Sequence, residues 1–153
     1  MSRLALLAAG VAGLTAFGVA PAVAAPAPQA ATALTTVTTC GSLGYQAGLA
    51  TKVCAEVTGT SVALYGQVGL AGPPSPGSPA PQPKQLITTL SGEVVGGASL
   101  GTLNQNVVFT ASTIQVRGVG GTVPCGSTVH ASFAVASFPW SPNPVTLDLP
   151  VTC

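Results

Sequence analysis

The segment TVHASFAV, residues 128–135, places an apolar side chain at every second position. A period of two residues is typical of a β-strand that buries one face and exposes the other. On that pattern His130 lies on the exposed face of its strand. The same spacing recurs near the C-terminus in VTLDLPVT, residues 145–152. The two segments therefore predict two half-buried strands.

The same pattern predicts further strands upstream. Residues 52–57 and 61–70 alternate in this way, and valine and threonine, which favour strands, are frequent. Residues 85–95 and 106–117 predict two more strands. In the latter, the apolar positions change from odd to even numbers near Ser112. We expect a bulge or kink at that point, because an extra residue shifts the alternation.

Together with the region around residues 34–40, these segments predict about seven to nine short strands and no helix after the N-terminal leader. Many short strands at regular spacing are typical of an all-β protein. We predict a two-sheet antiparallel sandwich with immunoglobulin-like, Greek-key connections. A small closed β-barrel is the alternative.

Residues 1–25 have the form of a secretory signal peptide, with a basic start, an apolar stretch and small residues at the cut. Arg3 supplies the charge, and residues 4–19 are apolar apart from glycine and one threonine. Cleavage is expected after Ala25, with Ala24 as the alternative. We therefore predict a secreted, extracellular protein that has no membrane contact once the leader is removed.

The rest of the chain suits one domain. Residues 26–33 (PAPQAATA) predict a flexible N-terminus, and residues 34–153 a single β domain. Within this domain, residues 72–83 (GPPSPGSPAPQP) hold six prolines. Proline-rich sequence favours extended polyproline II geometry, so we expect a long loop between strands here.

All four cysteines follow the leader, at Cys40, Cys54, Cys125 and Cys153. An even number of cysteines in an exported chain predicts disulfides. Of the three pairings, we favour Cys40–Cys54 and Cys125–Cys153, because each pair flanks a plausible hairpin or strand pair. The chain has no Cys-x-x-Cys motif and one histidine, so no metal site or cofactor is expected.

Charge is scarce after the leader. The three basic and three acidic side chains are Lys52, Lys84, Arg117, Glu56, Glu93 and Asp148. Such a chain has no basic patch to neutralise phosphates, so nucleic acid is not an expected partner. Three carboxylates and one histidine are also a thin supply for acid–base chemistry.

One motif has a catalytic form. GASLG, residues 97–101, matches the G-x-S-x-G pattern in which hydrolases place a nucleophilic serine. Ser99 would need His130 and Asp148 as partners. The pattern also needs a following helix and the chain order serine, acid, histidine, and both are missing here. We interpret this segment, and the glycine-rich residues 118–122, as turns, and expect no enzyme and no catalytic residue.

The most suggestive stretch for binding is FPWSPNP, residues 138–144. It holds Phe138 and, between prolines, the only tryptophan, Trp140. A rigid loop loses little entropy when it binds. A single tryptophan in a small domain more often folds back and plugs the end of the sandwich, since tryptophan buries a large apolar area. Tyr45 and Tyr65 could join a binding face.

We therefore predict a non-catalytic extracellular binding module, with Trp140, Phe138 and Tyr65 as candidate site residues. The expected ligand is a glycan, a cell wall or a protein surface. The alternative is a structural or cell-surface protein that self-associates, since little charge opposes association. A small serine hydrolase or a protease inhibitor fits the sequence less well.

Overall fold

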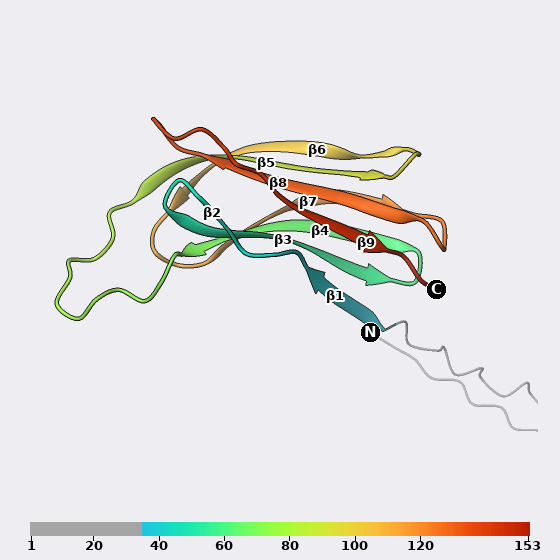
Figure 1. The fold of residues 1–153 in the computed structure, drawn as a ribbon, viewed down its shortest axis with the longest axis horizontal. Coiled ribbons are helices and arrows are strands. Elements are labelled where there is room, and N and C mark those ends of the chain that lie inside the picture. Colours follow the sequence, from blue (N-terminus) through green and yellow to red (C-terminus); the bar gives the residue numbers. More distant parts are fainter. Residues whose placement is uncertain (1–34) are drawn as a thin grey trace, which may run out of the picture. The chain divides into compact units, whose positions relative to one another are not determined.

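A computed structural model describes residues 35–153, which form nine β-strands (Figure 1). The predicted signal peptide and residues 26–33 lie outside the described residues. The strands are β1 (Thr36–Cys40), β2 (Gly44–Gln46), β3 (Leu49–Thr58), β4 (Ser61–Leu70), β5 (Lys84–Val94), β6 (Ser99–Phe109), β7 (Ile114–Thr122), β8 (Thr128–Ala136) and β9 (Val145–Pro150).

The strands form two antiparallel sheets that face each other. Sheet A has the order β1-β3-β4-β7, with β2 also paired to β3, and sheet B has the order β6-β5-β8-β9. The non-sequential neighbours β4–β7 and β5–β8 arise because the chain crosses between the sheets, as in Greek-key connections. The sheets do not close into a barrel, so the predicted sandwich is confirmed.

The core lies between the sheets, where the alternating residues meet. Val129, Ala131, Phe133 and Val135 of β8 are all buried, as their spacing predicts. Gly66 of β4 lies against the Phe133 ring, and a Cβ at this glycine would collide with it. The two sheets can approach closely here only because β4 carries no side chain at that position.

The sequence suggested one bulged strand over residues 106–117, but this segment belongs to two strands. β6 ends at Phe109 in sheet B, and β7 begins at Ile114 in sheet A. Ala111 in the connection has a φ of 70°. The change from odd to even apolar positions therefore marks the passage between sheets, because the core-facing side is set separately for each strand.

Residues 118–122 are not a turn but the second half of β7. The register against β4 shifts between Leu64 and Tyr65, which leaves Gly118 as an extra residue. Its φ of 132° is accessible to glycine and rare for other residues. A similar shift lies on β6 near Gly101, whose φ is 116°. Both irregularities lie on strands at the edge of a sheet, where bulges are frequent.

Both disulfides join the favoured pairs. Cys40 and Cys54 lie directly opposite each other on β1 and β3, and Cys125 bonds to Cys153 at the C-terminus. Two disulfides fit an extracellular protein, because oxidising compartments preserve them. Residues 71–83, which link the two sheets between β4 and β5, are all exposed and extend away from the strands in Figure 1. Within residues 35–153, no helix is long and apolar enough to cross a membrane.

Candidate binding site

The loop after β8 presents two aromatic rings to solvent. Phe138 is 98% exposed and Trp140 is 62% exposed. A tight turn holds them, since the backbone N–H of Trp140 donates to the Ser137 carbonyl at 2.6 Å and the Ser137 N–H donates back at 3.3 Å. The Ser137 hydroxyl also donates to the carbonyl of Gln85 at 2.9 Å. Trp140 therefore does not plug the end of the sandwich.

The buried side chain of Gln46, which is 2% exposed, anchors the far end of this loop. Its Oε1 accepts hydrogen bonds from the backbone N–H groups of Val135 at 2.9 Å and Asn143 at 3.2 Å. Its Nε2 donates to the Phe133 carbonyl at 3.1 Å and to Thr51 Oγ1 at 3.0 Å. The amide thereby satisfies backbone groups that would otherwise be buried without partners.

The need for Gln46 follows from the length of β9. This strand begins at Val145, opposite Phe133, so the last residues of β8 have no neighbour on that side. Gln46, from β2 of the other sheet, takes the place of the missing strand. Sequence patterning gave no signal for this role, because a glutamine beside a tyrosine in a three-residue strand is an ordinary surface pattern.

A groove with a volume of about 480 Å³ lies beside Phe138 on the outer face of sheet B. It is lined by Gln85, Leu86, Ile87, Asn106, Val107, Val108, Ser137 and Phe138. Ile87, Val108 and Phe138 are exposed apolar side chains. No charged side chain lines the groove, and the ammonium group of the neighbouring Lys84 donates to the Ala47 carbonyl.

Tyr65 does not join this site. It lies on the outer face of sheet A and is only 7% exposed. Its register partner on β3 is Cys54 of the Cys40–Cys54 disulfide, and the Arg117 guanidinium covers its ring at 4.2 Å from the centroid. Tyr65 thus lies on the outer face, but the Arg117 guanidinium stacked on its ring shields it from solvent.

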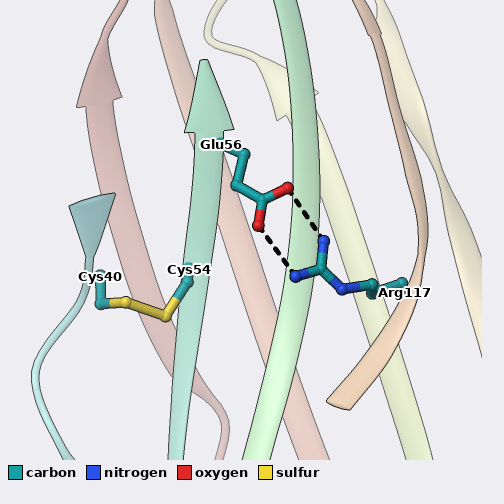
Figure 2. Close-up of a disulfide and its surroundings, with 4 residues drawn as sticks. All are labelled: Cys40, Cys54, Glu56 and Arg117. Atoms are coloured by element: carbon teal, nitrogen blue, oxygen red, sulfur yellow. Dashed lines mark hydrogen bonds and ion pairs between the residues drawn. A yellow bond between two sulfur atoms is a disulfide. The ribbon is translucent and has the colours of Figure 1, made fainter. Parts of the chain in front are cut away.

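Arg117 itself is held by Glu56. Figure 2 shows the guanidinium reaching across β4 to the carboxylate on β3, with N–O distances of 2.9 and 2.8 Å. The paired hydrogen bonds from Arg117 lower the pKa of Glu56 below its usual range, and the same bonds raise the pKa of Arg117. Tyr65, Arg117 and Glu56 on this face thus contact one another.

The candidate hydrolase residues occupy a row across the outer face of sheet B. Ser99 lies opposite Glu93, Glu93 opposite His130, and His130 opposite Asp148. His130 Nδ1 and Asp148 Oδ1 are 2.6 Å apart. The sequence suggested that Ser99 belongs to a turn, but it is the first residue of β6. It lies two strands from His130, a separation of roughly 10 Å, and its hydroxyl accepts a hydrogen bond from the Gly101 N–H.

This row borders a second hollow of about 310 Å³. Across residues 35–153, no group of three or more His, Cys, Asp or Glu side chains is placed to hold a metal ion. The geometry thus places Phe138 at the groove, with Trp140 exposed in the same loop but not lining it. It separates Tyr65 from both residues and keeps Ser99 apart from His130. Comparison of the chain with protein-family models, with curated proteins and with solved structures gave no match.

Proposed function

We propose that this chain is a secreted, non-catalytic binding module that takes an uncharged carbohydrate in the groove beside Phe138. The observation that carries the proposal is the composition of that groove. An almost fully exposed aromatic ring stands next to the amides of Gln85 and Asn106, with no charge around them.

The chemistry of this lining suits a neutral sugar. The apolar C–H face of a pyranose packs on an aromatic ring, while its hydroxyl groups hydrogen-bond to amides, which both donate and accept. An ionic ligand would need a compensating charge, because desolvating an unpaired charge is costly. Ile87 and Val108 add apolar contact area at the same place.

Preorganisation of the loop also favours binding. Ser137, Gln46 and the turn at Trp140 fix the backbone on both sides of Phe138. A ring held in place before binding loses little conformational freedom on contact, so more of the interaction energy contributes to affinity. Export is supported by the leader pattern of residues 1–25 and by the two disulfides.

The test is a binding screen of the disulfide-intact protein on neutral and charged polysaccharides, followed by calorimetry on any that bind. Phe138→Ala should weaken binding to a neutral polysaccharide by about tenfold or more, as expected for loss of a central aromatic contact. Trp140→Ala should weaken it less, because Trp140 is not one of the residues that line the groove.

Tyr45→Ala is the matched control. Tyr45 is also an exposed aromatic residue, but it lies on β2 of the opposite sheet. If Tyr45→Ala weakened binding as much as Phe138→Ala did, the groove would not be the site. Preference for an acidic polysaccharide, or for apolar probes such as fatty acids over sugars, would contradict the proposed ligand class.

A further inference from the structure

The outer edge of sheet B is formed by β6, which pairs with β5 and has no second neighbour within residues 35–153. β6 spans Ser99–Phe109, eleven residues with the sequence SLGTLNQNVVF. None of these residues is charged and none is proline. A long edge strand exposes a row of backbone N–H and C=O groups that can pair with another strand.

The other edges of the sandwich are protected. β9 has six residues and carries Asp148 and Pro150, and β7 carries Arg117 and the irregularity at Gly118. β1 and β2 have only five and three residues. Short length, charge, proline and bulges are the devices that keep sheet edges from pairing. Apart from the irregularity at Gly101, β6 has none of these protective features.

The inner face of β6 is also incompletely covered. Leu103 and Val107 pack against the core but remain partly exposed, because no further strand shields them. Between them Gln105 is exposed. The segment 103–109, LNQNVVF, is free of charge, proline and glycine, and such segments pair readily with copies of themselves.

We infer that β6 is a self-association edge, at which a second copy of this chain pairs antiparallel in a register centred on Gln105. Gln105 lies midway between the irregularity at Gly101 and the end of the strand at Phe109. A two-fold axis at this residue uses the whole regular part of β6. The same patch then serves both copies, as in most homodimers.

This register is self-complementary on both faces of the sheet. On the core side, Leu103 faces the partner's Val107, so the partly exposed aliphatic side chains cover one another. On the outer side, Asn104 faces the partner's Asn106, and amide pairs can exchange hydrogen bonds. No charged side chain lies on β6, so no like charges oppose one another along the contact. Directly opposed aliphatic pairs and hydrogen-bonded pairs stabilise a sheet.

The pairing has a consequence for the groove of sheet B. A two-fold axis perpendicular to the sheet joins the two copies of sheet B edge to edge and keeps both outer faces on the same side. The grooves beside Phe138 would then open onto one continuous surface. The inference does not depend on what those grooves bind.

Two double variants with the same two positions changed test both the contact and its register. In N104K/N106K, each introduced lysine faces an introduced lysine of the partner, so like charges oppose one another. In N104K/N106E, the lysine introduced at position 104 faces the glutamate introduced at position 106 of the other copy, so opposite charges meet. Both variants lose the hydrogen bond that Thr89 donates to Asn104 Oδ1 at 2.7 Å, so this loss cancels in the comparison.

The measurement is sedimentation equilibrium over a wide range of protein concentration at low salt, with circular dichroism to establish that each variant is folded. The wild type should dimerise, and N104K/N106K should raise the dimer dissociation constant by about tenfold or more. N104K/N106E should dimerise at least about tenfold more tightly than N104K/N106K, because its opposed charges attract.

Thr146→Lys is the control, because it places a lysine at an exposed position on the other edge strand of sheet B, β9. It should leave the wild-type dissociation constant unchanged. A wild type that stays monomeric at every concentration, or an N104K/N106K variant that dimerises like the wild type, would overturn the inference. Equal loss of dimerisation in both double variants would overturn the register on which it rests.

Discussion

Tyr65 and Phe138 are aromatic residues associated with the outer faces of the two sheets, but Tyr65 of sheet A is covered by its neighbours and Phe138 beside sheet B is free. On sheet A, Tyr65 lies beneath Arg117, and Arg117 is bound to Glu56. On sheet B, Phe138 and Ile87 project into solvent beside a groove. Exposure of an aromatic residue is thus decided by its neighbours and not by its place on an outer face.

From this difference we expect the two outer faces to have different roles, one in stability and one in binding. We expect the covered part of sheet A to contribute to stability, because Tyr65 is buried beneath Arg117 and lies opposite Cys54 of the disulfide. On sheet B, we expect the exposed Phe138, Ile87 and Val108 to contribute little to stability and to remain available for contact with other molecules. Each part of this comparison can be tested by substitution.

The largest expected effect is on sheet A, from removing the disulfide between β1 and β3. In Cys40→Ser with Cys54→Ser, the free energy of unfolding should fall by about 3 kcal/mol, since the bridge closes a loop with a sequence separation of 14. Urea denaturation of the variant and the wild type measures this. Binding at the groove of sheet B should be retained under conditions where the variant is folded, and an unchanged urea midpoint would show that the bridge does not stabilise this face.

A smaller effect distinguishes the aromatic residues of the two faces. Tyr65→Ala should lower the free energy of unfolding by about 2 kcal/mol, because a buried ring is lost. Phe138→Ala should change it by no more than about 0.5 kcal/mol, as is usual for exposed positions. Thermal denaturation of the two variants side by side provides the measurement. Equal destabilisation by both substitutions would contradict the distinction between a covered and an open face.

The smallest effect is the pH dependence of the ion pair. Because Arg117 lowers the pKa of Glu56 in the folded protein, the pair contributes stability above the pKa of the unfolded glutamate, about 4.3. That contribution is lost as the pH falls through the lower, folded-state pKa. In Arg117→Gln, an NMR titration of the carboxyl carbon should show a higher pKa for Glu56 than in the wild type. An unchanged titration would mean that the pair does not form in solution.

The strands that were predicted correctly share one property. β8 and β9 each bury one face and expose the other, so burial leaves a period of two in the sequence. Residues 99–105 of β6 were missed because this stretch has polar side chains on both faces, as Asn104 and Gln105 show and as an edge strand allows. The end of β7 was mistaken for a turn because glycine is common in turns, whereas Gly118 here accommodates an extra residue in a ladder.

The candidate site was predicted in part. The proline-flanked aromatic residues Phe138 and Trp140 lie in an exposed loop, as one of the two interpretations required. The groove beside them was not foreseen, because Gln85, Asn106 and Phe138 come from three separate segments. Gln46 was missed for the same reason, since it lies about ninety residues before the loop that it anchors.

Periodicity, composition and short spacing along the chain established the scarcity of charge and predicted the all-β class, with a sandwich favoured over a barrel and one cysteine pairing favoured over two others. The folded protein was needed to show which sheet each strand joins, that Tyr65 is covered and Phe138 is free, and that β6 is an open edge. These features depend on residues distant in sequence that come together across strands. Alternation along one strand reports whether a residue faces the core or the outside, and carries no information about its neighbour on the next strand.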